Sequence, residues 1–124
     1  MGGKDFAAIE ERLRAILARH VPPLLVTADR SGYFALSVDR TDIPEPRRFV
    51  GAARVGKSYV SFHLMPVYAF PELVKDISPE LRKRMQGKSC FNFTRLDGTL
   101  LEELADLTDR GINRYREIKL PFNR

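Results

Sequence analysis

The chain has 124 residues, of which 44% are hydrophobic and 30% are charged. A chain of this length forms one domain with its own core, and this composition excludes a disordered protein. Lysine and arginine number 21 against 16 aspartates and glutamates, which gives a formal net charge of +5. Because acids and bases are mixed along the whole chain, the distribution is typical of a solvated surface and argues against a nucleic-acid partner.

One cysteine and two histidines limit the metal and redox chemistry open to the chain. Cys90 has no second cysteine for a disulfide, and with His20 and His63 it cannot complete a four-ligand structural zinc site. No apolar run reaches the roughly 20 residues that cross a bilayer, and the first residues carry acids where a signal peptide has an apolar stretch. We therefore expect a single cytoplasmic domain over residues 1–124, without a membrane partner.

The first predicted element is a helix over residues 5–20. Its apolar residues recur at spacings of three and four along one face, while glutamates and arginines occupy the other. Asp5 is placed to cap the start, and Pro22 and Pro23 end the helix soon after His20.

Four strands in two hairpins are predicted next. Residues 24–29 and 33–38 are predicted as strands on either side of a turn that contains Gly32, and residues 33–38 alternate apolar with polar or small side chains. Residues 48–64 form the second hairpin, which turns at 55–57. This alternation predicts a sheet with one buried face and one face that no long helix covers.

Two short helices and a fifth strand follow in the prediction. Pro71 begins the first short helix, and the pair Ser78 and Pro79 caps and begins the second. Gly87 is in the usual position to end that helix. Residues 89–94 then alternate as a strand.

The last predicted element is a long amphipathic helix, begun by a capping box of Thr99 and Glu102. Gly111 interrupts it, which we attribute to close packing against the sheet or the first helix. The whole order predicts an α+β fold. Its antiparallel sheet has about five strands, the N- and C-terminal helices pack on one face, and two short helices precede the last strand.

A polar patch that binds a ligand is predicted on the open face of this sheet. Tyr59 and His63 alternate with buried positions of their strand, and Cys90 and Asn92 share one face of the fifth strand, just after Lys88. The patch requires these two strands to be neighbours. Cys90 has two readings, a thiolate nucleophile stabilised by a neighbouring base or an inert packed thiol, and the second is the commoner state of a lone cysteine. We assign no catalytic residue.

Residues 51–58, GAARVGKS, match the phosphate-loop pattern G-x-x-x-x-G-K-[ST]. That motif needs a following helix whose N-terminus holds the phosphates, whereas residues 58–64 have the alternation of a strand. We therefore interpret the match as a hairpin and do not predict nucleotide hydrolysis.

The stretch 56–93, GKSYVSFHLMPVYAFPELVKDISPELRKRMQGKSCFNF, resembles the small bacterial YdhG-like family, a domain of unknown function. The resemblance rests on the Gly-Lys turn before a strand that ends His-Leu-Met-Pro, the proline-started helices and the phenylalanine-rich strand after Gly87 and Lys88. It covers roughly residues 47–118. It implies a compact α+β fold. Some members are described as frataxin-like iron chaperones, which implies iron held on clustered carboxylates.

Three functions are compatible with the sequence. The first is a non-enzymatic domain that binds an unknown small molecule or protein on its polar sheet face. The second is an iron chaperone, which would combine Asp39, Asp42 and Glu45 with acids of the first helix. The third is weak polyanion binding by a set of basic residues, namely Arg48, Arg82, Lys83, Arg84 and Lys88. No cofactor is identified.

Overall fold

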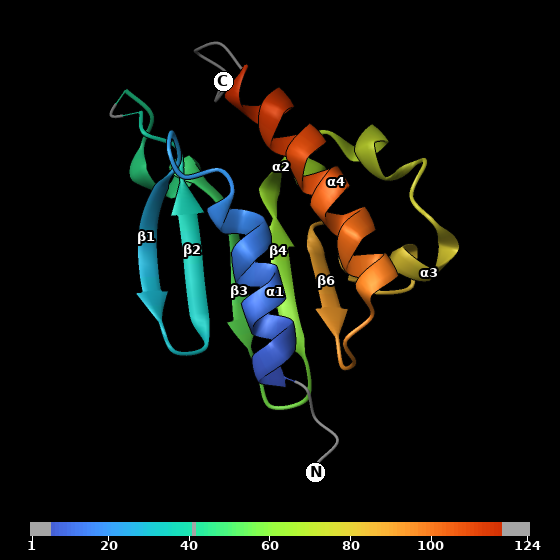
Figure 1. The fold of residues 1–124 in the computed structure, drawn as a ribbon. Coiled ribbons are helices and arrows are strands. Elements are labelled where there is room, and N and C mark those ends of the chain that lie inside the picture. The colour runs from blue at the N-terminus through green and yellow to red at the C-terminus, as the bar shows by residue number, and fades with distance from the viewer. Residues whose placement is uncertain (1–5, 41, 118–124) are drawn as a thin grey trace.

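A computed structural model describes residues 6–40 and 42–117, and its centre is a six-stranded antiparallel sheet (Figure 1). The strands lie in the order β1-β2-β3-β4-β6-β5. Their bounds are β1 Leu25–Arg30, β2 Tyr33–Ser37, β3 Phe49–Val55, β4 Val60–Leu64, β5 Met85–Gln86 and β6 Cys90–Phe93. Sequential antiparallel pairs from β1 to β4 confirm the two predicted hairpins.

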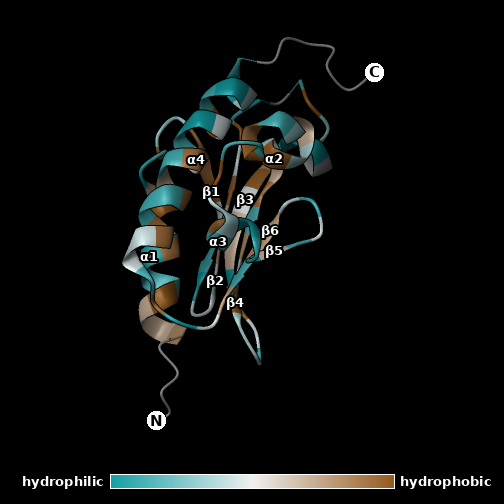
Figure 2. Cartoon of the chain, turned by 90° about the vertical axis from the view of Figure 1, so that its right-hand side faces the viewer, coloured by the Kyte–Doolittle hydropathy of each residue, from teal (hydrophilic) through white to brown (hydrophobic). Residues whose placement is uncertain are grey.

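Two long helices pack together on one face of the sheet. Figure 1 shows α1 and α4 crossing in front of the strands, and Figure 2, turned by 90°, shows both on the same side. The helices are α1 Phe6–Ala18, α2 Met65–Ala69, α3 Pro79–Arg82 and α4 Gly98–Arg116, with short 3-10 helices η1 Glu45–Arg48 and η2 Pro71–Val74. Within the described ranges, no helix is long and apolar enough to span a membrane.

This arrangement confirms the predicted α+β class and the placement of both terminal helices on one face. The sheet has a sixth strand because residues 85–86 pair with β6 as a two-residue edge strand. The core lies between the helices and the sheet. Its largest fully buried side chains include Phe62, Phe91, Leu13 and Leu104.

The predicted capping box of α4 is wrong. The helix begins at Gly98, and the Asp97 carboxylate accepts a hydrogen bond from the Leu100 backbone N–H at 3.2 Å. Aspartate is as good an N-cap as serine or threonine, so the helix starts earlier and Thr99 falls within its first turn. The predicted cap of the first helix, Asp5, lies outside the described residues.

Two predicted glycine roles also differ from the structure. Helix α3 already ends at Arg82, and Gly87, with φ 79°, lies in the turn between β5 and β6. Positive φ suits glycine in a tight hairpin as well as at a helix end, and the sequence does not separate the two. Gly111 approaches Pro66 of α2, where an added Cβ would lie 3.0 Å from the Pro66 Cβ, instead of the sheet or α1.

The predicted cap at Ser78 is confirmed, and it also joins α3 to α4. The Ser78 Oγ accepts from the Leu81 N–H at 3.1 Å and donates to the Glu103 carboxylate at 2.7 Å. The Ser78 N–H donates to the other Glu103 oxygen at 2.6 Å. This side chain therefore fixes the short helix against the long one.

We expect Ser78→Ala to lower the free energy of unfolding by about 1–2 kcal/mol, because it removes an N-cap and a donor to a half-buried carboxylate. Urea unfolding measures this change. Thr99→Ala is the control, since Thr99 makes no capping bond, and its expected change is within about 0.5 kcal/mol. Equal losses in both variants would contradict the assignment of the caps.

Candidate functional site: the open face of the sheet

Side chains on the face away from α1 and α4 form two rows across the strands, because residues opposite each other in antiparallel strands point to the same side. The central row contains Ala28, Ala35, Ala52, His63, Cys90 and Gln86. The basic row contains Arg30, Tyr33, Arg54, Ser61, Asn92 and Arg84. We call these two rows the open face.

Gly51 shows which side of the sheet the helices cover. An added Cβ there would lie 3.3 Å from the Leu17 Cδ2 of α1, so the side of β3 that includes Gly51 faces the helices. Ala52 and Arg54 alternate with it and lie on the opposite side. In Figure 2 that side of the strands carries neither α1 nor α4.

The structure brings three of the five predicted site residues together. His63 lies directly opposite Cys90, and Asn92 lies opposite Ser61, whose Oγ donates to the Asn92 Oδ1 at 2.8 Å. The His63 ring meets the Phe49 ring edge-on, with 5.1 Å between centroids. The requirement that their two strands be neighbours is therefore met.

Tyr59 and Lys88 lie at opposite ends of the β4–β6 pair. Tyr59 precedes β4 and lines a shallow hollow together with Arg54 and Lys57. Lys88 lies in the turn before β6 and lines a different hollow, which it shares with Tyr68. The five predicted residues therefore extend along the strands and do not surround one point.

Burial sets the protonation of the His63 and Cys90 pair. It lowers the pKa of His63, and it raises the pKa of the Cys90 thiol, an effect that a hydrogen bond with Ser89 partly offsets. Near pH 7 the pair is therefore a neutral imidazole beside a protonated thiol. These groups donate and accept hydrogen bonds, whereas a nucleophilic cysteine needs a thiolate. This environment favours the second interpretation of Cys90, a packed and unreactive thiol.

The lowered pKa of His63 makes a testable contribution to stability. Below its ordinary value of 6.5, the unfolded chain binds this proton more readily than the folded chain. The contribution is complete above about pH 6.5 and is lost as the pH falls through the lower folded pKa. We expect His63→Gln to reduce the loss of unfolding free energy between pH 7 and pH 5, measured by urea unfolding at each pH. Identical losses in both proteins would exclude a buried neutral His63.

Arg54 lies at the junction of two shallow hollows. One is lined by Arg30 and Tyr33, and the other by Lys57 and Tyr59. The Arg30 guanidinium lies over the Tyr33 ring, 4.7 Å from its centroid. Arg30, Tyr33 and Arg54 are not among the site residues predicted from the sequence. Their alternation with buried residues along each strand does predict that they face away from the core. It does not predict that they lie side by side, which follows only from the register of the paired strands.

Arg84 completes the basic row at the far edge. Its carbonyl accepts from the Asn92 N–H at 2.8 Å, and the pairing of Met85 with Phe91 continues the same register. The Arg84 Nε is buried and has no hydrogen-bond partner within the described residues. The Arg84 side chain as a whole is half-buried, so part of it remains open to a ligand.

The two rows of the open face contain no aspartate or glutamate. Acids gather on the helices, for example Glu10 and Glu11 on α1 and Asp106 on α4. Asp29, beside Arg30 in sequence, faces the helices and pairs with Arg14. The helices also carry bases, for example Arg12 on α1 and Arg110 on α4, so the helix side has mixed charge and only the two rows of the open face are free of acids.

Some residues of the other two predicted ion-binding sets bind groups of the protein itself. The Arg48 Nε donates to the Ile43 carbonyl at 2.6 Å, and Arg82 donates to the Val74 carbonyl, so both guanidiniums hold loops. Among residues 6–40 and 42–117, no group of three or more His, Cys, Asp or Glu side chains is placed to hold a metal. Asp42, one of the acids considered for iron, is bound by Arg40 at 3.0 Å.

The phosphate-loop match lies in a hairpin, as the sequence predicted. Residues 51–55 belong to β3, and the chain turns directly into β4 at Val60. A strand, not a helix, directly follows the Gly56 and Lys57 of the motif. Its backbone therefore lacks the helix N-terminus that holds phosphates in nucleotide hydrolases.

The fold and this face define a class of protein, an α+β domain with an uncovered sheet face that is basic and free of acids. Comparison of the chain with family models, curated proteins and solved structures finds no match. The resemblance to the YdhG-like family therefore stays a prediction.

Proposed function

We propose that the chain is a non-enzymatic binding domain whose open face binds single-stranded nucleic acid. The observation that carries the proposal is the basic row, in which Arg30, Arg54 and Arg84 cross an acid-free face. The polar sheet face is the one predicted from the sequence, but the expected ligand is now nucleic acid, because strand pairing puts three arginines in one row that the mixed charge along the sequence does not reveal.

The spacing of the cations favours an extended ligand over a small one. Strands lie about 4.8 Å apart, so Arg30 and Arg54 are separated by about 10 Å and the whole row spans about 24 Å. A single small anion cannot contact all three arginines. A chain of phosphates can, and single-stranded nucleic acids bind along such basic tracks at about 4–16 nucleotides per site.

The neutral side chains of the face suit bases. Ala35 and Ala52 are only 3% and 5% exposed, so neighbouring side chains cover the middle of the face and a ligand would contact those neighbours. Tyr33 and the 40% exposed Tyr59 lie beside the cations, and unstacked bases stack on such rings. Ser61, Asn92 and neutral His63 supply hydrogen-bonding groups for base edges.

Fluorescence anisotropy with a short, labelled, mixed-sequence single-stranded oligonucleotide tests the proposal. We expect binding at low salt that weakens linearly on a plot of log affinity against log salt concentration, because phosphate contacts release counterions. Polyglutamate of similar charge is the comparison. No binding at low salt would end the proposal, and equal binding of polyglutamate would show that the face recognises anionic chains without regard to bases.

A further inference from the structure

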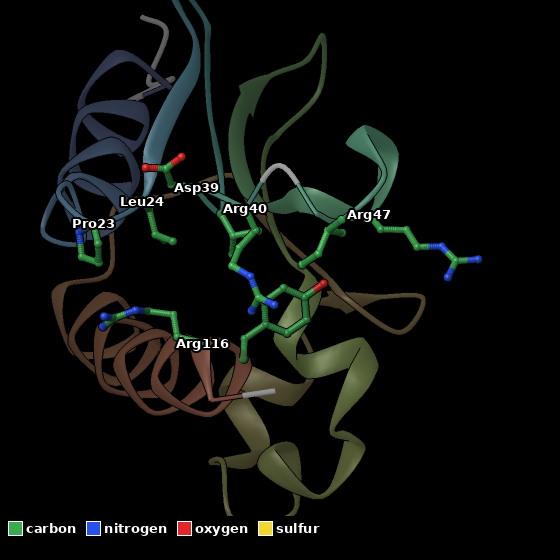
Figure 3. A pocket seen from close by; sticks show the side chains of 9 residues that line it. Pro23, Leu24, Asp39, Arg40, Arg47 and Arg116 are labelled. Atoms are coloured by element: carbon green, nitrogen blue, oxygen red, sulfur yellow. The ribbon is translucent and has the colours of Figure 1, made fainter. Parts of the chain in front are cut away.

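A further concavity, of about 230 Å³, lies at the end of the molecule where α4 finishes, and it is independent of the open face (Figure 3). Three segments far apart in the sequence form it: the connection before β1, the connection between β2 and β3, and the last turn of α4. Its lining residues are Pro23, Leu24, Val38, Asp39, Arg40, Ile43, Arg47, Tyr115 and Arg116.

The inner wall of this cavity is apolar and rigidly held. Leu24, Val38 and Ile43 are 2%, 8% and 3% exposed, so they belong to the core and present only a small surface to the cavity. The Val38 N–H donates to the Arg48 carbonyl at 2.8 Å, and the Arg48 side chain donates to the Ile43 carbonyl. The wall therefore offers a preformed site for a compact apolar group.

Two of the three lining arginines are occupied elsewhere. Arg40 binds the Asp42 carboxylate through two hydrogen bonds of 3.2 and 3.0 Å. Arg47 extends away from the cavity in Figure 3. Arg116 and Asp39 differ from these, because within the described part of the chain neither side chain has a hydrogen bond or an ion pair. Figure 3 shows the Asp39 carboxylate beside Leu24, and Arg116 across from Pro23.

The cavity thus offers one unpaired cation, one unpaired anion and an apolar wall. A further donor is the Tyr115 hydroxyl, because burial raises the pKa of Tyr115 and the phenol keeps its proton at neutral pH. A simple carboxylate would leave Asp39 unpaired, and a simple amine would leave Arg116 unpaired. A zwitterion carries one partner for each of these two groups.

We propose that this cavity binds a free apolar α-amino acid. Arg116 receives the carboxylate, Asp39 receives the ammonium group, and the side chain lies on Leu24, Val38 and Ile43. The size fits, because the volume is below the roughly 300–1,000 Å³ of sites for drug-sized ligands and so admits only a small molecule.

Methyl-resolved NMR of the whole chain with L-leucine as the probe tests this site. We expect saturable shifts at the methyl groups of Leu24, Val38 and Ile43. Two matched compounds separate the charges: 4-methylpentanoate lacks the ammonium group and isopentylamine lacks the carboxylate. Both should bind at least about tenfold more weakly than leucine, because each leaves one charged group of the site unpaired.

Variants of the two charged residues complete the test. Arg116→Gln and Asp39→Asn should each weaken leucine binding by about tenfold or more, while Arg110→Gln, elsewhere on α4 and paired with Asp106, should leave it unchanged. Both site residues are exposed, so the variants are expected to fold. The proposal is overturned if leucine causes no shift at these methyl groups, or if 4-methylpentanoate binds as tightly as leucine.

Discussion

Replacing the three arginines of the basic row with glutamine, in Arg30→Gln/Arg54→Gln/Arg84→Gln, is expected to weaken binding of a single-stranded oligonucleotide at least about 100-fold at low salt. Each charged hydrogen bond contributes about 1.5–3 kcal/mol, and about 1.4 kcal/mol is a factor of ten. The slope of log affinity against log salt should also fall by about 2, since each lost phosphate contact removes about 0.7 on a single strand. Anisotropy titrations over a series of salt concentrations measure both.

A control variant with the same change in net charge distinguishes binding at the basic row from non-specific electrostatic attraction between the oligonucleotide and the whole protein. Arg12→Gln/Lys75→Gln/Arg110→Gln removes three exposed cations, of which Arg12 and Arg110 lie on the helices. Its affinity and salt slope should change far less than those of the row variant. If the two triple variants bind alike, the net charge of the protein governs binding and the open face has no special part in it.

The second large effect is expected at Gly51. An alanine Cβ there would lie 2.8 Å from the His63 backbone oxygen and 3.3 Å from the Leu17 Cδ2. The His63 carbonyl belongs to β4 and cannot yield without moving the strand, so we expect Gly51→Ala to lower the free energy of unfolding by about 1–3 kcal/mol. Chemical denaturation with an unchanged m value measures the change.

Gly98→Ala is the matched control, because an added Cβ there has no atom within 4 Å. This variant should have unchanged or slightly raised stability. A Gly51→Ala protein as stable as Gly98→Ala would contradict the close approach of β3 to β4 and α1. The close contact at Gly51 also explains why the phosphate-loop match begins with a glycine: the packing of β3 against β4 and α1 leaves no room for a side chain.

The sequence predicted the fold class because that class depends on local patterns. Alternation over residues 33–38 and 48–64 and the spacing of apolar residues in α1 and α4 each indicate an element without knowledge of its partners. The predictions of helix ends were wrong where two local backbone conformations are close in energy. Asp97 and Thr99 can both cap a helix, and Gly87 can end a helix or turn a hairpin.

The site was only partly predictable, because it depends on strand register. A single assumed pairing, that of the strands before and after residues 65–89, predicts that His63, Cys90 and Asn92 are neighbours, and that pairing exists. The basic row needs every pairing from Arg30 to Arg84 at once, and a shift of one residue would turn a side chain to the other face. The absence of acids from these two rows is likewise a property of the folded sheet.

The most direct test of the open face is a backbone amide NMR titration with the single-stranded oligonucleotide. We predict saturable shifts at Tyr33, Arg54, Ser61 and Asn92, and none along the outer surface of α4. Shifts confined to the helices, or no shift at low salt, would contradict the claim that this uncovered basic face is the binding surface.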